Sequence, residues 1–459
     1  MRTMDIARRD LHIANADKNA KLTEDAFHYI YANPETGFKE WKTHKYLWDG
    51  FVALGYEPVA AGNIPGFYVD LDTGRPGPTV AVMGEMDALI VEGHPDADPE
   101  TGAVHACGHC CQAAALLGLA ATLKEPGALD GLCGRIRLMA VPAEELIEVE
   151  FREQLRKDGV IRYYGGKTEF MARGLLNGVD MAFMSHTTVS GPHSGRVSGG
   201  SNGFITKQVT FTGRSAHAGG APHKGINALY AANQALSAIN ALRETFEDAS
   251  HIRVHPIITA GGAVVNAIPD RVVLESYLRG ATMEAVRDAN RKVNRALAGS
   301  AAAMGAGVTI SDRPGYFPRN HDVGMMELMR DAMEQVMEEV IYKPTSFGTG
   351  SSDMGDVSGV MPVAHPYVGG ADGKSHSVEF RILDVNAACV DMVKLHAVAL
   401  ELLLGNEAAR AKAIIAAHTP LFASIEEYLR FADSFILDRE VVRYDDKGNV
   451  ILNLGEEEL

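Results

Sequence analysis

The sequence predicts a discontinuous α/β domain that is interrupted by a smaller, inserted α+β domain. Two features of the pattern support this fold class. In the first third of the chain, short and almost wholly apolar segments alternate with helical segments, which is typical of a parallel sheet covered on both faces. This pattern stops near residue 198 and resumes only near residue 319. The length of 459 residues suits two or three domains.

The first α/β part begins with two helical segments. Residues 24–31 are expected to form a helix that stops at the turn dipeptide Asn33-Pro34, and residues 43–54 a helix that stops at Gly55. Apolar strands and a helix rich in Ala and Leu follow: strands 79–83, 135–140 and 180–184, and helix 112–124.

The inserted part has the order β-α-β-β-α-β. In the segment 271–279, Val272 and Leu274 share one face, while Glu275 and Arg279 share the other. This period-two alternation predicts a sheet with one covered and one open face, and places Arg279 on the open face. The expected strands are 204–211, 252–258, 271–278 and 308–310, and the expected helices are 226–246 and 283–304.

The α/β pattern then returns, with a helix over 322–339, a strand near 361–368 and a helix over 385–404. The predicted parts are therefore 1–200 and 319–405 for the two pieces of the α/β domain, 201–318 for the insert, and 406–459 for a polar C-terminal extension.

Charge and composition exclude several classes of partner. The chain has 43 basic and 59 acidic residues and a net charge of −16, without the basic run that a nucleic-acid groove requires. The longest apolar stretch, 113–123, is too short for a bilayer, and the charged amino terminus is unlike a signal peptide. Five cysteines, an odd count, do not indicate a disulfide framework. We expect a cytoplasmic protein without nucleic-acid or membrane partners.

The densest cluster of polar residues is His105-Ala-Cys107-Gly-His109-Cys110-Cys111, in a loop just before a helix. Ligand-binding groups gather at such strand ends in open α/β sheets. Thiolate and imidazole groups suit a divalent metal such as zinc or manganese. The C-x-H spacing alone fits a buried loop with a hydrogen-bonded histidine equally well.

Two adjacent carboxylates, Glu144 and Glu145, come directly after the apolar strand 135–140. Such a pair is costly unless a positive charge compensates it, and a metal ion would do so. One Glu would then bind the ion, and the other would remain available as a general base. The alternative is a helix N-terminus whose dipole favours acidic residues.

Further acid and imidazole groups lie at strand ends or in the loops beside them: Glu85 and Asp87 in GEMD, His186 in MSH, and His376 in GKSHSVEF. Each group alone fits a structural role, such as a hydrogen-bonded histidine in a loop. Their convergence with the two motifs above favours a metallohydrolase site.

These motifs resemble the M20 metallopeptidases, in particular the amidohydrolase branch of aminoacylases, auxin-conjugate hydrolases and aminobenzoyl-glutamate hydrolases. The matching segments run in family order over residues 25–405: NPETGFKE, GEMDAL, HACGHC, VPAEE, MSHT, GRSAHAGGAPHKGINAL, NAIPD, GTGSSDMGDVS and GKSHSVEF. The resemblance implies a metallohydrolase domain with an inserted lid or dimerisation domain, and a homodimer or a higher homo-oligomer.

The resemblance also implies roles for individual residues. Glu144 matches the general base, and Asp87 matches the acid that orients a metal ligand. The metal ligands it implies, for one or two ions of manganese or zinc, are Cys107, His109, Glu145, His186 and His376, with the thiolate able to bridge two ions.

In the insert, His217, Asn266 and Arg279 match residues that hold the substrate's carboxylate or carbonyl oxygen, in some members across a dimer interface. The open-face placement of Arg279 fits a carboxylate clamp. From the residues alone, a turn histidine, a turn asparagine and a solvated strand charge are the simpler interpretations.

The sequence departs from the family pattern around this motif. Cys110 and Gln112 stand where the family has an acid and a histidine, and Glu85 replaces a shorter acid. Leu146-Ile147 replaces a glycine-containing loop, and a longer segment follows it. These changes leave the number of ions and the reaction type open.

The leading expectation is a metal-dependent enzyme that hydrolyses the amide between an acyl or aroyl group and an amino acid. Glu144 would take a proton from ion-activated water and return it to the leaving nitrogen, while His217 and the metal stabilise negative charge on oxygen. One alternative is hydrolytic deamination of an electron-poor aminoarene, as in nitroanthranilate aminohydrolase-like members. A non-enzymatic binding relative is the other, but the intact ligand and base residues argue against it.

Overall fold

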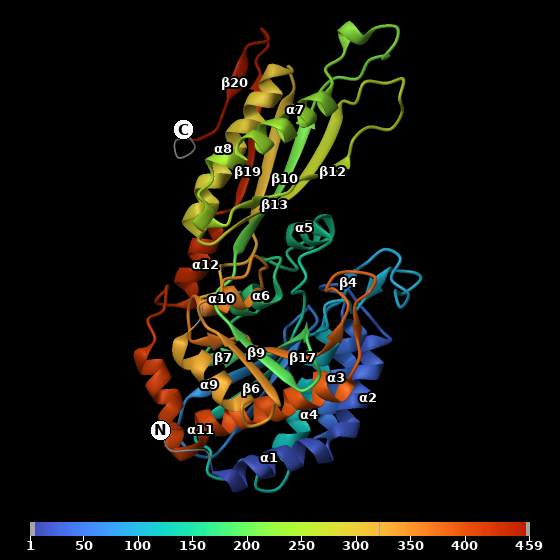
Figure 1. Cartoon of the computed structure of the whole chain (residues 1–459). Helices are drawn as coiled ribbons and strands as arrows, with labels where there is room; N and C mark the ends of the chain where they lie inside the picture. The colour runs from blue at the N-terminus through green and yellow to red at the C-terminus, as the bar shows by residue number, and fades with distance from the viewer. Residues whose placement is uncertain (1–4, 321, 456–459) are drawn as a thin grey trace. The chain divides into compact units, whose positions relative to one another are not determined.

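The computed structural model describes residues 5–320 and 322–455, which form two compact units (Figure 1). Unit 1 contains the described residues up to Gly200 together with Asn320–Phe347 and Asp356–Glu426. Unit 2 contains Ser201–Arg319, Gly348–Gly355 and the described residues from Glu427 onward. The chain therefore enters unit 2 after unit 1 and returns to unit 1, as expected for an inserted domain.

The main sheet of unit 1 has the strand order β1-β2-β6-β3-β7-β16. Strands β6, β3, β7 and β16 are parallel, whereas β2 is antiparallel to both β1 and β6. The three strands predicted as parallel, 79–83, 135–140 and 180–184, are confirmed in β3, β6 and β7. The antiparallel strand β2 was not predicted, and its alternate residues face solvent. The strands are β1 (Val59–Ala60), β2 (Phe67–Asp72), β3 (Thr79–Glu85), β6 (Arg135–Val141), β7 (Met181–Phe183) and β16 (Val363–Ala364).

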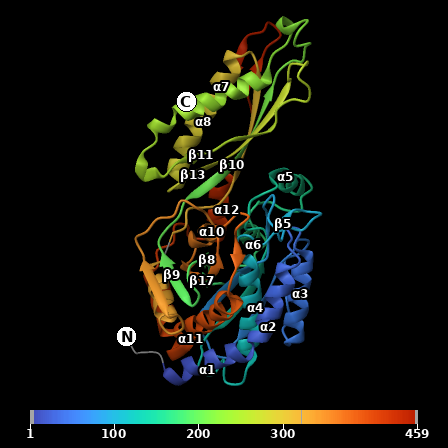
Figure 2. The same ribbon diagram turned by 45° about the vertical axis from the view of Figure 1, so that its right-hand side comes forward.

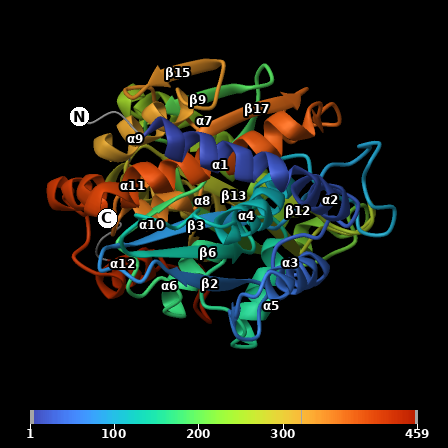
Figure 3. The same cartoon turned by 90° about the horizontal axis from the view of Figure 1, so that it is seen from below.

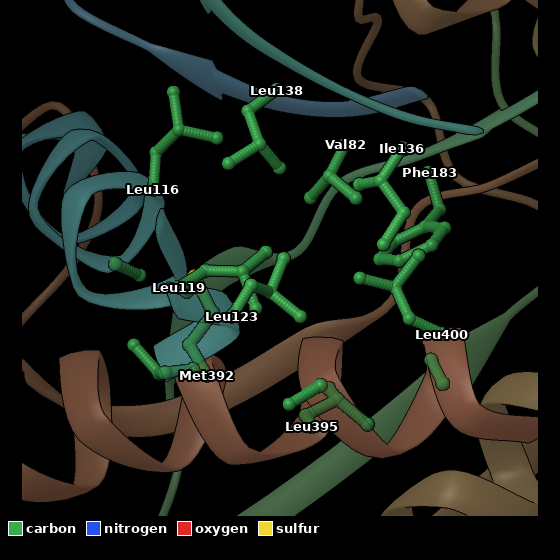
Figure 4. Close-up of a cluster of buried hydrophobic side chains, with 14 of the residues drawn as sticks. Val82, Leu116, Leu119, Leu123, Ile136, Leu138, Phe183, Met392, Leu395 and Leu400 are labelled. Carbon is green, nitrogen blue, oxygen red and sulfur yellow. The ribbon is translucent and has the colours of Figure 1, made fainter. Parts of the chain in front are cut away.

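Two helices, α4 (His109–Lys124) and α11 (Asp391–Ala417), lie on the same face of this sheet (Figure 3). Every residue of α4 from His109 to Leu123 is buried, which explains why its sequence is apolar on all sides. Apolar side chains of both helices and of the strands point toward one another (Figure 4): Leu116, Leu119 and Leu123; Met392, Leu395 and Leu400; Val82, Ile136, Leu138 and Phe183.

Unit 1 also contains a second sheet, a pair of two-residue strands and further helices. A second sheet joins β15-β9-β17-β18, with β8 also paired to β17. Its strands are β8 (His186–Val189), β9 (Ser194–Ser198), β15 (Glu339–Lys343), β17 (Tyr367–Asp372) and β18 (Arg381–Ile382); β4 (Leu89–Ile90) pairs with β5 (Ala103–Val104). The helices are α1 (Ile6–Lys18), α2 (Ala20–Tyr31), α3 (Trp41–Ala53), α5 (Val149–Lys157), α6 (Gly166–Ala172) and α9 (Val323–Met333), and a π-helical turn, Asn386–Val390, precedes α11.

Two predicted elements of this region differ from the structure. The helix over 322–339 ends at Met333, because the β-branched residues that follow pair in parallel with β9. The strand near 361–368 is two strands, β16 and β17, in different sheets. Pro362 and Pro366 flank β16, and proline lacks the N–H that a continuous ladder requires.

Unit 2 is built on a seven-stranded antiparallel sheet of order β11-β13-β10-β14-β19-β20, with β12 also paired to β13. Helices α7 (Ala228–Ala241) and α8 (Met283–Ala303) cover one face of it (Figure 2). The strands are β10 (Gly203–Thr212), β11 (Arg253–Val254), β12 (Ile257–Ala260), β13 (Arg271–Gly280), β14 (Gly307–Pro314), β19 (Leu437–Tyr444) and β20 (Val450–Leu452).

Residues after 405 do not form the separate extension that was predicted. After Gly405–Ala408, whose backbone is not helical, a further helical segment of α11 runs to Ala417. After α12 (Ile425–Asp433), the strands β19 and β20 extend the sheet of unit 2 beyond β14. Residues 348–355 also join unit 2, where Gly348 accepts a hydrogen bond from the Asn202 backbone N–H at 3.1 Å. Within the described residues, no helix combines the length and hydropathy needed to cross a membrane.

Candidate metal centre

Gly108 separates Cys107 from His109 and sets the direction in which α4 begins. Its φ of 94° lies in the left-handed region, which favours glycine. A Cβ at this residue would approach the Cβ of Thr187 to 3.1 Å. The sharp turn lets the buried thiol and the buried imidazole face the same space at the start of the helix.

The ring of His109 is oriented by Asp87. Its Nδ1 lies 3.0 Å from Oδ1 and 3.1 Å from the backbone oxygen of Asp87. The backbone oxygen and an ionised carboxylate oxygen can only accept hydrogen bonds. Nδ1 therefore carries a hydrogen, and Nε2 offers a lone pair when the ring is neutral, as it would be on binding a metal. Among the described residues, the buried Nε2 has no hydrogen-bond partner, and a metal ion would satisfy it.

His186 and His376 approach the same sulfur from two different loops. Nδ1 of His186 donates to the backbone oxygen of Thr187 at 2.6 Å, which leaves Nε2 facing Cys107 Sγ at 3.3 Å. His376, with a φ of 62°, is anchored by its backbone N–H on Ala106 O at 2.9 Å. Its Nε2 lies 3.4 Å from Cys107 Sγ.

Two groups of ligand atoms share the Cys107 sulfur. One group is Cys107, His109 and His186, and the other is Cys107, Glu145 and His376; within each group the ligand atoms lie within 4.8 Å of one another. The shortest separations are 3.0 to 3.4 Å. Ligands about 2.0–2.3 Å from one ion at angles near 90–110° have such separations, so this donor set fits a divalent metal. The structure thus brings together all five predicted ligand residues.

Electrostatics favour the anionic ligand forms. Burial and the Glu145 charge raise the pKa of the Cys107 thiol, but His109 and His186 outweigh them and lower it to about 6. Burial raises the pKa of Glu145, while its hydrogen bond to His376 and the charge of that ring lower it to about 2. Hydrogen bonds to Cys107 and Glu145 raise the pKa of His376 to about 11. Protons on the imidazoles therefore balance these anions, and a divalent ion would replace them.

The two predicted acids outside the ligand set lie at the carboxyl ends of neighbouring parallel strands. Glu144 follows β6, is largely buried, and places Oε2 3.9 Å from His109 Nε2. Asp87 follows β3, and its Oδ2 accepts a hydrogen bond from the Glu145 backbone N–H at 2.7 Å. Since its Oδ1 faces His109, Asp87 contacts one residue of each ligand group.

Three residues that depart from the family pattern are wholly or almost wholly buried beside these groups. Gln112 Nε2 donates to Glu85 Oε2 at 2.9 Å, and Gln112 Oε1 accepts from the Glu85 backbone N–H at 3.3 Å. Burial and a hydrogen bond to Cys111 raise the pKa of the Cys110 thiol, so this residue does not replace the missing acid with a charge.

Lys167, which sequence reasoning did not single out, is the residue that pairs with Glu85. Its side chain is buried and its Nζ bonds to Glu85 Oε1. A lysine at the start of a short helix carries no sequence signal of burial, because lysine is almost never fully buried unless it is paired. Only the packing of α6 reveals this contact.

The three predicted residues of the insert lie in unit 2, at two ends of its sheet. The exposed His217 pairs with Ala267, and the Ala218 N–H bonds to Asn266 O at 2.9 Å, so these two predicted residues lie on adjacent loops (Figure 1). Both loops adjoin the end of β10 at Thr212, whereas Arg279 pairs with Phe204 near its beginning. From Phe204 to Thr212 a strand rises roughly 26 Å.

The side chains of His217 and Arg279 have defined partners. His217 Nδ1 accepts hydrogen bonds from the N–H groups of Gly219 and Gly220, at 3.2 and 2.9 Å. The neutral ring therefore carries its hydrogen on Nε2, as an outward donor. Arg279 Nη1 donates to Ser351 Oγ at 2.8 Å, and its guanidinium lies 4.7 Å from the ring centre of Phe204.

Residues 199–303 match the M20 family model described as the peptidase dimerisation domain. The chain is 33% identical over 261 residues to indole-3-acetyl-aspartic acid hydrolase of Enterobacter agglomerans. The aligned region covers 54% of this chain and 55% of that protein. It is 33% identical over 259 residues to one of the subunits of p-aminobenzoyl-glutamate hydrolase of Escherichia coli, again over 54% and 55% of the two chains. The chain thus spans about half the length of these curated relatives.

Solved structures share the fold. A dinuclear metal-binding peptidase of the M20 family from Bacillus subtilis has a TM-score of 0.62 and 21% identity, over 85% of this chain and 99% of that chain. Together these findings confirm the resemblance and the predicted fold class. The chain carries a peptidase dimerisation domain of the M20 type, and its homologues include M20 amidohydrolases.

Proposed function

We propose that this chain is a metal-dependent hydrolase of C–N bonds that acts on the amide of an N-acyl or N-aroyl amino acid. The observation that carries the proposal is the pair of ligand groups that share the Cys107 sulfur, with the carboxylate of Glu144 beside them. A general base next to a candidate divalent-metal site suits the hydrolysis of an unactivated amide by water.

Five residues would hold one or two ions, and thiolate, imidazole and carboxylate donors suit zinc or manganese. An ion held there would supply Lewis acidity, which polarises a carbonyl group and makes water more acidic. Glu144 accepts the proton of the attacking water at its carboxylate and delivers it to the departing nitrogen. Asp87 keeps the His109 ring oriented, and its hydrogen bond from the Glu145 backbone N–H holds the two ligand groups at a constant separation. The ligand residues are Cys107, His109, Glu145, His186 and His376.

The substrate class follows from the curated relatives and from Arg279. Both relatives are named for substrates that join an aromatic acyl group to an acidic amino acid. Arg279 offers a guanidinium beside the rings of Phe204 and Tyr277, which suits a carboxylate attached to a largely apolar ligand. We therefore assign Arg279 to binding the substrate carboxylate, with Asn266 as a second substrate-binding residue.

The proposal is tested by product analysis on metal-loaded protein. A panel of N-acyl amino acids, p-aminobenzoyl-glutamate and nitroanthranilate is incubated with the protein, and free amino acid and ammonia are measured separately. We expect release of the amino acid without ammonia, and none from a Glu144→Gln blank. Ammonia from nitroanthranilate alone would instead assign the deamination reaction. Absence of both products from a metal-loaded protein would favour a binding relative.

The predicted substrate-binding residues of unit 2 lie at two ends of its sheet. A homodimer in which each copy supplies His217 to the site of the other accounts for this separation. One sheet end carries His217 and Asn266, and Arg279 lies near the other end, so one substrate cannot contact all three residues of a single unit 2. The dimerisation domain supports an oligomer that supplies the missing group from a second copy. The outward Nε2–H of His217 is a suitable donor for an oxyanion.

Mixing two inactive variants tests this exchange. His217→Ala and Glu144→Gln homodimers are each expected to be inactive. A heterodimer has one site in which both residues are intact if His217 acts across the interface, so it should regain up to about half of the activity per dimer. Activity is measured on purified, doubly tagged heterodimers. No recovery would place His217 in the site of its own copy or outside catalysis, and a fully active monomer would reject the exchange.

A further inference from the structure

Two of the residues that depart from the family pattern contact each other. Gln112 hydrogen bonds to Glu85 through both its side-chain nitrogen and its side-chain oxygen. Lys167 completes the cluster by binding the other carboxylate oxygen, Oε1. All three residues are at least 98% buried, so a carboxylate, an amide and an ammonium contact one another in the protein interior. Burying such a polar network costs free energy, which indicates that Glu85 has a functional role.

The Glu85 oxygen that accepts the hydrogen bond from Gln112, Oε2, also faces the candidate metal centre. Oε2 lies 3.1 Å from His109 Nε2, the buried nitrogen that has no hydrogen-bond partner within the described part of the chain. This separation is like those within the two ligand groups, which are 3.0 Å for His376 Nε2 to Glu145 Oε1 and 3.3 Å for Cys107 Sγ to His186 Nε2. Glu85, His109 and Glu144 also form a third group of atoms within 4.8 Å of one another.

We propose that Glu85 is a further metal ligand, bound through Oε2 to the same ion as His109. Lys167 and Gln112 are positioning residues: the ammonium occupies Oε1 and the amide fixes the carboxylate plane, so that Oε2 alone is presented to the ion. Because the ammonium offsets the carboxylate charge, the centre gains a ligand with little change in net charge. This inference rests on the proposed metal centre and extends its ligand set.

Metal binding, measured without substrate, tests the assignment. Metal-free protein is titrated with Mn²⁺ by calorimetry, and Co²⁺-loaded protein is examined by visible absorption, which reports the ligand set. Glu85→Gln is expected to weaken the binding of one ion by at least about 10-fold and to change the Co²⁺ spectrum. Lys167→Met should weaken the same ion less. The matched control is Lys207→Met, which removes a buried lysine that pairs with Asp312 in unit 2, and should leave both readouts unchanged.

A double variant separates ligation from charge balance. If Glu85 only neutralised Lys167, then Glu85→Gln/Lys167→Met would regain the affinity of the original protein, which would overturn the proposal. If Glu85 is a ligand, the double variant stays weak. Should Glu85→Gln fail to fold by circular dichroism, Glu85→Asp, which withdraws the carboxylate by one methylene, is expected to give the same loss.

The parent proposal is checked in the same series. Loss of metal in Cys107→Ala together with unchanged affinity and spectrum in Glu85→Gln would reject Glu85 alone. Unchanged metal content in Cys107→Ala would reject the proposed centre as a whole.

Discussion

Replacing Glu144 by Gln is expected to lower turnover by about 10²–10⁴-fold or more, while the protein keeps its metal. Glutamine has the shape of glutamate but accepts no proton at neutral pH, so the variant loses the base and keeps the packing. Because the Glu144 carboxylate lies 3.9 Å from His109 Nε2 and outside the two ligand groups that share Cys107, its loss leaves those groups intact. Steady-state rates and elemental analysis on the same preparation check both parts of the expectation.

The matched control is Glu150→Gln. Glu150 is an exposed acid in the first turn of α5, only six residues further along the chain. We expect its rate to remain within about twofold of the original protein, since exposed substitutions away from a site have small effects. Near-normal turnover of Glu144→Gln would rule out Glu144 as the proton acceptor.

Removal of metal ligands is expected to have the second large effect, and the two most informative variants should differ. Cys107 belongs to both ligand groups, so Cys107→Ala should lose all bound metal after dialysis and with it the activity. His376 belongs to one group, so His376→Ala should lose the ion of that group first. Elemental analysis of protein purified without chelator measures ions per chain.

Cys133→Ala is the control for removing a thiol. Cys133 is also a buried free cysteine of unit 1, but it lies in none of the ligand groups found among the described residues. The Cys133→Ala variant should therefore retain the metal content of the original protein. Full metal content in both Cys107→Ala and His376→Ala would contradict the assignment of these residues as ligands.

Helices and strands that are buried on all sides were predicted from their own sequence, whereas a strand that pairs with a distant part of the chain was missed. Helix 112–124 and the strand near 135–140 were predicted closely, because nearly continuous burial makes their sequences largely apolar. The strand pair β19 and β20 was missed. Its residues alternate in burial, and its pairing partner β14 lies more than a hundred residues earlier in the chain. Such alternation is weak in a polar segment when its partner is unknown.

Some residues of the site were predictable because each stands where a strand ends. Asp87 and Glu144 follow β3 and β6, neighbouring parallel strands whose carboxyl ends meet at one edge of the sheet. The proximity of the loops that carry His217 and Asn266 could not be predicted, because it depends on the pairing of two segments that are not adjacent in sequence.

By itself, the sequence determined the discontinuous α/β class, the M20 resemblance and the residue types available for metal binding, because periodicity and motif spacing are local properties of the chain. Only the tertiary structure decided that Cys107 is shared by two ligand groups, that Gln112 and Lys167 hold Glu85, and that Glu85 faces His109. The physical reason is that a buried charge is stable only beside its partner. That partner, Lys167, is 82 residues from Glu85 in the sequence, and packing alone brings it there.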